Sequence, residues 1–144
     1  MHIPRYYLAY GSNMVLEQME ERCPDAKLVS KEYLEGWTLE FIESPSGTYL
    51  NLVTSLFGRT PVFIWDISKD DEVNLDLYED WPRSYIKKDI RCSKGIAMMY
   101  IMHRSHTTKG LPKDSYINPI LDVYRKEGYD TTHILNLLKG DSDA

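Results

Sequence analysis

Four consecutive residues near the amino terminus, Tyr10, Gly11, Ser12 and Asn13, have types that suit anion binding. They stand where an extended apolar pattern changes into a helical one. A turn at such a corner directs several backbone amides and the positive end of a helix dipole at one place, which suits a carboxylate or a phosphate. A capped helix start that binds nothing explains the same residues, so these four positions leave both interpretations open.

A second segment, residues 75–85, places three carboxylates among Leu, Tyr and Trp side chains. Asp76 and Asp80 fit the solvated outer face of a helix. Glu79 differs, because it lies close to Pro82, where the helix has to end. A carboxyl group surrounded by aromatic side chains holds its proton more tightly, which suits a general acid or base. We therefore expect Glu79 to stand at the edge of a cavity.

Metal and nucleophile chemistry have weaker support in the sequence. His103 and His106 share a polar loop, but they could hold zinc only if further ligands came from elsewhere. Cys23 and Cys92 are too few for a disulfide framework, and we interpret both as core residues. The sequence has no glycine-rich phosphate loop and no serine elbow. We expect neither a metal nor a cofactor.

The strands that must position these residues follow from alternating and β-rich runs. They are expected at residues 3–10, 28–42, 49–54, 61–67, 85–92 and 96–102. Turn residues at 44–47 and 94–95 predict two antiparallel hairpins. Gly58 predicts a further turn, between the third and fourth strands of this series.

Helices are expected where apolar residues recur at helical spacing. They cover about residues 14–22, 68–80, 117–124 and 131–138. Ser12 or Asn13 would cap the first helix, and Ser68 with Asp71 forms a variant of the capping box at the start of the second. Pro119 suits the first position of the third helix; if that helix starts earlier, Pro119 lies in its first turn or bends it.

Hairpins punctuated by helices that do not alternate regularly with strands indicate the α+β class, with a mainly antiparallel or mixed sheet. The 144 residues suit one domain, expected at residues 1–139, followed by a disordered tail at 140–144. Apolar residues make up 42% and charged residues 27%, which excludes disorder for most of the chain.

Charge and composition also limit the partners. With 17 basic and 22 acidic residues the net charge is −5, so we expect no nucleic-acid partner. No amino-terminal stretch has the length and apolar character of a signal peptide or membrane span, so we expect no membrane association. Together with the low cysteine content, this predicts a cytoplasmic protein. The sequence does not indicate an oligomeric state.

Six segments, in matching order, resemble the γ-glutamylcyclotransferase-like family. They are YLAYGSNM at 7–14, RCP at 22–24, GWTLEF at 36–41, PVFIWDIS at 61–68, LDLYEDWPRSY at 75–85 and PKDSY at 112–116. The most specific pair is the amino-terminal YGSN with the downstream LDxxE. The resemblance covers residues 6–129 and implies a compact mixed β-barrel with peripheral helices and a pocket at the YGSN turn.

The resemblance also implies roles for individual residues. In that family the backbone around the turn holds the α-carboxylate of a γ-glutamyl group, and the Glu of LDxxE, here Glu79, is the general acid and base. The implied lining of the γ-glutamyl site is Tyr7, Leu8, Ala9, Tyr10, Gly11, Ser12 and Asn13. Tyr116 would complete the pocket wall or hydrogen-bond the substrate. The family usually has Gly where this chain has Asp80, whose carboxylate could narrow the pocket, raise the pKa of Glu79 or repel acidic substrates.

The implied reaction takes a small-molecule γ-glutamyl amide as its substrate. The α-amine closes a five-membered ring on the γ-carbonyl carbon, which releases 5-oxoproline and an amine or amino acid without a metal, a cofactor or an enzyme nucleophile. One alternative is a non-catalytic module that binds a small acid or a peptide terminus, for which Asp80 is the main argument. Another is a metal-dependent hydrolase built on His103 and His106.

Overall fold

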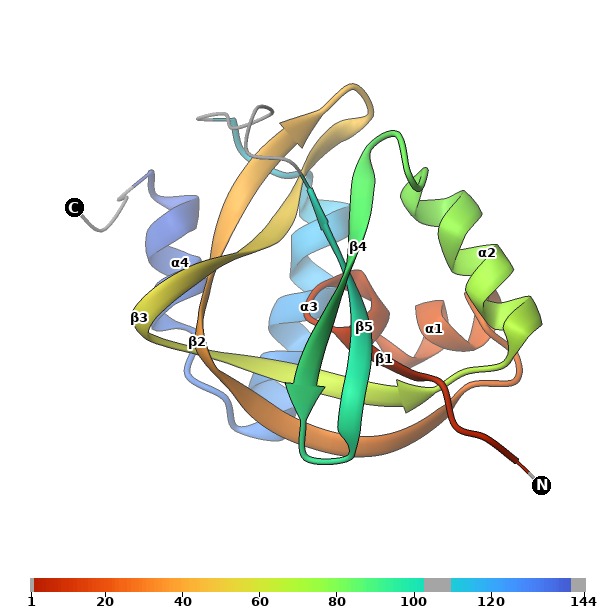
Figure 1. The fold of residues 1–144 in the computed structure, drawn as a ribbon. Helices are drawn as coiled ribbons and strands as arrows, with labels where there is room; N and C mark the ends of the chain where they lie inside the picture. The colour runs from red at the N-terminus through yellow and green to blue at the C-terminus, as the bar shows by residue number, and fades with distance from the viewer. Residues whose placement is uncertain (1, 103–109, 141–144) are drawn as a thin grey trace.

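The computed structural model describes residues 2–102 and 110–140, which form one mixed sheet with helices packed against it (Figure 1). The strands in these segments are β1 (Tyr6–Ala9), β2 (Lys27–Ser44), β3 (Gly47–Asp66), β4 (Tyr85–Cys92) and β5 (Gly95–Met102). Their order is β2-β3-β1-β5-β4, in which β1 and β5 run parallel and all other neighbours run antiparallel. The α+β class with a mainly antiparallel, mixed sheet is thereby confirmed.

The helices pack around the corner that follows β1 and against β2. They are the 3-10 turn η1 (Ser12–Met14), α1 (Leu16–Arg22), α2 (Lys69–Glu79), α3 (Asp114–Glu127) and α4 (Thr132–Leu138). Helix α3 contacts η1, α1 contacts both η1 and α2, and α4 contacts β2. Apolar side chains from the strands and helices form one buried core around these contacts. None of the helices in the described segments has the length and apolar character that crossing a bilayer would demand.

Closure of the sheet into a barrel is not confirmed. Across the described residues the strand pairing ends at β2 on one side and at β4 on the other. A side chain joins the distant parts of the sheet instead: the Nδ2 of buried Asn51 in β3 donates to the Met102 carbonyl oxygen (3.2 Å), and its Oδ1 accepts from the Met102 amide (2.8 Å). The Asn51 side chain therefore links β3 to the end of β5, but no backbone hydrogen bonds between β2 and β4 close the sheet in the described residues.

The long strand β3 corrects one expectation. Residues 49–54 and 61–67 belong to the same strand, and Gly58 does not reverse the chain. The register against β2 shifts next to Trp37, where residues 55–58 fall outside the ladder. A Cβ atom at Gly58 would lie 2.5 Å from the carbonyl oxygen of Trp37. Close backbone approach, and not a turn, is what requires glycine here.

Helix α2, which carries Glu79, begins and ends where the sequence predicts. The Oγ of Ser68 accepts a hydrogen bond from the amide of Asp71 (3.0 Å), and the Asp71 carboxylate accepts one from the amide of Ser68 (3.1 Å). The helix stops at Glu79, since Asp80 adopts a left-handed conformation before the turn that contains Pro82. These two ends fix Glu79 as the last helical residue.

Two other helix starts differ from expectation. Helix α1 begins at Leu16, and neither Ser12 nor Asn13 caps it, because Arg22 occupies both side-chain oxygens. Helix α3 begins at Asp114, so that Pro119 lies inside it and beyond its first turn. The buried face of α3 compensates for the backbone hydrogen bond that this proline cannot donate.

Three expectations fall on residues outside the described segments. They concern His103, His106 and, apart from Gly140, the tail at 140–144.

Candidate active site

A cavity of about 360 Å³ lies where several elements that are distant in the sequence meet. Its walls come from the β1–η1 corner, the carboxyl end of α2 with the turn after it, the β2–β3 turn, and the first residues of β4 and α3. Seven tyrosines contribute to the lining, so aromatic rings shield much of it from solvent. A volume of this order accommodates a small metabolite.

The cavity brings together most of the residues assigned by the resemblance. Those that line it are Tyr7, Tyr10, Gly11, Ser12, Asn13, Glu79 and Tyr116. Leu8 and Ala9 are fully buried in β1, at 0% and 1% exposure, and they are not part of the lining. A contribution of these two residues through their backbone stays a prediction.

Arg22 holds the turn at residues 11–13 in place. Its Nη1 donates to the Oγ of Ser12 (3.0 Å) and to the Oδ1 of Asn13, and its Nη2 donates to the Oε1 of Gln18 (3.0 Å). The guanidinium carbon lies 3.6 Å from the centre of the Tyr78 ring, a distance at which cation–π attraction is strong. The sequence did not identify Arg22 as a site residue. Its signal in the sequence is the RCP segment, because this arginine at the end of α1 bonds back to Ser12 and Asn13.

The backbone and amide of Asn13 are fixed as well. Its Nδ2 donates to the hydroxyl oxygen of Tyr7 (3.0 Å), and its carbonyl oxygen accepts from the Nε1 of Trp65 (3.1 Å). Asn13 is 2% exposed, so every one of these bonds is shielded from competing water. The turn is therefore tied to β1, α1 and β3 by side-chain hydrogen bonds.

Glu79 stands half-buried in the cavity wall. Burial raises the pKa of its carboxyl group to about 7, and the positive charge of Arg22 acts in the opposite direction. The shift comes from burial and not from Asp80, whose carboxylate instead accepts a hydrogen bond from the Oγ of Ser84 (2.9 Å). A carboxyl group with such a pKa can accept and return a proton near neutral pH.

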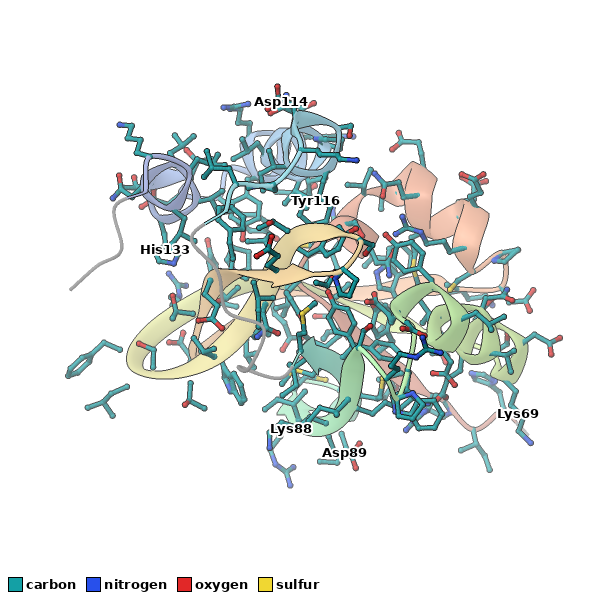
Figure 2. All side chains as sticks on the ribbon, turned by 90° about the horizontal axis from the view of Figure 1, so that it is seen from above. Lys69, Lys88, Asp89, Asp114, Tyr116 and His133 are labelled. Carbon is teal, nitrogen blue, oxygen red and sulfur yellow. The ribbon has the colours of Figure 1, made fainter. Side chains whose placement is uncertain are left out.

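Tyr116 in α3 forms a further part of the cavity wall. Figure 2 shows its side chain between α3 and the β2–β3 hairpin, whereas Lys88 and Asp89 point outward from β4. The Tyr116 hydroxyl oxygen accepts from the amide of Leu50 (3.0 Å), and it lies 3.2 Å from the position that a Cβ atom at Gly11 would take. A side chain at Gly11 would push Tyr116 away, so glycine permits this contact.

A network of charges on the outer side keeps α2 against β4 and β5. The Tyr100 hydroxyl donates to Asp76 (2.6 Å), and the Nζ of Lys87 lies 2.9 Å from Asp76 and 2.8 Å from Glu72. Arg5 donates two hydrogen bonds to Glu72, which is the main reason why the pKa of that carboxyl group falls to about 2. The network orients the helix that ends in Glu79.

Metal chemistry finds no support in the part of the chain that is described. Residues 2–102 and 110–140 contain no group of three or more His, Cys, Asp or Glu side chains that could hold a metal ion.

The fold is that of γ-glutamyl cyclotransferase. A solved structure of that name matches with a TM-score of 0.75 and 20% identity, over 94% of this chain and 86% of the other. The structure of protein loc79017 from Homo sapiens gives the same score and identity, over 94% and 87%. YkqA from Bacillus subtilis matches with a TM-score of 0.68 and 18% identity, over 87% of this chain and 49% of its own.

These matches confirm the predicted resemblance as a likeness of fold. No protein-family model matches the chain, and a search of curated proteins found no match.

Asp80 carries a backbone constraint of its own. Its φ of 55° is left-handed, a conformation in which a side chain costs roughly 1 kcal/mol or more and glycine costs little. This accounts physically for the glycine that the γ-glutamylcyclotransferase-like family usually has at the matching position.

Replacing Asp80 tests that constraint. We expect Asp80→Gly to be more stable than Asp80→Ala by about 1 kcal/mol in denaturant unfolding. Both variants lose the side-chain hydrogen bond with Ser84, but the left-handed φ is strained for alanine and not for glycine. An alanine variant as stable as the glycine variant would contradict this explanation.

Proposed function

We propose that this protein cyclises the γ-glutamyl group of a small γ-glutamyl amide to 5-oxoproline and releases an amine or amino acid. The observation that carries the proposal is that Glu79 and the turn at residues 11–13 line the same cavity. The likeness of fold to γ-glutamyl cyclotransferase supports the same reaction class.

In this proposal the turn binds the α-carboxylate of the substrate. Arg22 supplies positive charge behind the turn, since its hydrogen bonds go to the neutral oxygens of Ser12, Asn13 and Gln18. Within the described segments, no carboxylate forms an ion pair with Arg22, so its charge is available to a bound anion. The hydrogen-bonded turn lowers the entropic cost of holding the glutamyl chain.

The glutamyl chain then has to fold so that its nitrogen approaches its own γ-carbonyl carbon. Placement of this kind contributes on the order of 7 kcal/mol or more to lowering a barrier. In this proposal, such placement lets Glu79 serve as the acid and base with no nucleophile supplied by the protein.

Glu79 moves the protons. The α-ammonium group cannot attack, so the Glu79 carboxylate first removes one proton from it. The free amine forms the new C–N bond, loses a second proton, and the bond from the γ-carbon to the leaving nitrogen breaks as that nitrogen is protonated. Both protons given up by the attacking nitrogen end on the leaving amine, so the overall reaction releases none. A pKa near 7 suits both directions of transfer.

Glu79→Gln tests the proposal. The change keeps the size of the side chain and removes the base, so we expect release of 5-oxoproline from a panel of γ-glutamyl amino acids and γ-glutamyl amines to fall by about 10²–10⁴-fold. Glu20→Gln, on the exposed face of α1, is the matched control and should keep full activity. Tight binding of a γ-glutamyl compound that is recovered unchanged by the wild type would favour a binding module instead.

Measuring the stability of Glu79→Gln tests whether unfolding causes any loss of activity. Folding raises the pKa of Glu79 from 4.5 to about 7. At a pH between these two values, Glu79 is therefore protonated in the folded protein and ionised in the unfolded protein. Stability therefore falls as the pH rises through this range, by on the order of 3 kcal/mol in all. Glutamine carries no charge, and we expect the variant to unfold at higher denaturant concentration than the wild type at pH 8.

Arg22→Gln should change the pH profile of the same reaction. Arg22 lowers the pKa of Glu79, so its loss moves the acid limb of 5-oxoproline release to higher pH. Arg125→Gln, an exposed arginine in α3, is the control and should leave the profile unchanged. An unchanged acid limb in Arg22→Gln would show that Arg22 does not act on the catalytic carboxyl group.

A further inference from the structure

Tyr85 stands out among the tyrosines of the cavity because its hydroxyl group is unused. It is 9% exposed, it lines the cavity, and within the described segments its hydroxyl group makes no hydrogen bond. By comparison, the hydroxyl groups of Tyr10 and Tyr100 donate to the Tyr100 carbonyl oxygen and to Asp76 (2.6 Å each). The Tyr49 hydroxyl donates to the carbonyl oxygen of Ser46 (3.2 Å).

The turn after α2 fixes Tyr85 relative to Glu79. The Ser84 amide donates to the Asp80 carbonyl oxygen (2.8 Å), and the Ser84 Oγ donates to the Asp80 carboxylate (2.9 Å). These bonds close the short segment between the end of α2 and the start of β4. Tyr85 follows directly as the first residue of β4, so Glu79 and Tyr85 line the cavity from the two ends of one closed turn.

The Tyr85 hydroxyl group stays protonated at any working pH. Burial is the main reason that its pKa lies far above the ordinary value, and the negative charge of Glu79 raises it further. Tyr85 and Glu79 line the same cavity. A neutral hydroxyl group can donate a hydrogen bond, but it does not give up its proton here.

The proposed reaction needs such a donor. When the α-amine attacks, the γ-carbonyl oxygen gains negative charge, whereas Glu79 acts on the protons of the two nitrogens and not on this oxygen. A hydrogen-bond donor aimed at that oxygen stabilises the transition state more than the ground state. Arg22 already serves the turn that binds the other end of the glutamyl group.

We infer that Tyr85 is a further catalytic residue, whose hydroxyl group donates a hydrogen bond to the γ-carbonyl oxygen of the substrate as that oxygen becomes negative. This rests on the proposed function. No proton leaves Tyr85, so the proton balance between the attacking and leaving nitrogens is unchanged.

Tyr85→Phe tests the inference, with Tyr124→Phe as the matched control. Tyr124 is also a buried tyrosine whose hydroxyl group has no partner, but it does not line the cavity. We expect Tyr85→Phe to lower kcat for 5-oxoproline release by about 10²–10³-fold with KM changed only a few-fold. Tyr124→Phe should keep the kcat of the wild type. Both variants should be about as stable as the wild type, because neither hydroxyl group makes a hydrogen bond within the described segments.

A second measurement does not depend on turnover. The ring carbonyl oxygen of 5-oxoproline is the former γ-carbonyl oxygen, so the ¹³C shift of that carbonyl in the bound product reports a hydrogen bond to it. We expect a downfield shift on binding to the wild type and to Tyr124→Phe, and loss of that shift in Tyr85→Phe.

The outcomes separate the two proposals. An active wild type with a kcat loss below about 3-fold in Tyr85→Phe, or with an effect on KM alone, would overturn the role of Tyr85 and leave the proposed function standing. An unchanged ¹³C shift in Tyr85→Phe would do the same. A folded wild type that neither forms nor binds 5-oxoproline would overturn the proposed function and this inference with it.

Discussion

The hydrogen bonds of Arg22 are the interaction on which the cavity depends. They join the turn after β1 to the end of α1, and the guanidinium group lies over Tyr78, the residue before Glu79. The same positive charge limits how far burial can raise the pKa of Glu79. One side chain thereby holds the turn at residues 11–13, packs against Tyr78 at the end of α2, and lowers the pKa of Glu79, the base of the proposed reaction.

Local signals explain what the sequence could predict. The capping box of Ser68 with Asp71 and the break near Pro82 act within a few residues of one another, so the position of Glu79 at a helix end followed from the sequence. The errors arise from contacts between distant segments. Gly58 is required by the backbone of Trp37, and Arg22 takes the side-chain oxygen of Ser12 that would otherwise cap α1. Sheet closure also depends on long-range pairing, which periodicity cannot specify.

The cavity concentrates features that reduce stability. Glu79 is half-buried with a pKa displaced from its ordinary value, Asp80 has a left-handed φ, and the Tyr85 hydroxyl group makes no hydrogen bond in the described segments. The charge network around Lys87 and the apolar core provide the compensating stability elsewhere. Such a concentration of costs at one place is typical of a functional site.

Titration of Glu79 tests most directly the central claim that a half-buried carboxyl group in this cavity works as a base near neutral pH. Side-chain ¹³C carboxyl signals of labelled protein would be followed from acid to alkaline pH, with Glu79→Gln used to assign the signal. The structure predicts a signal that titrates at about pH 7 and is missing from the variant. A Glu79 signal that titrates at the ordinary value of 4.5 would contradict the account.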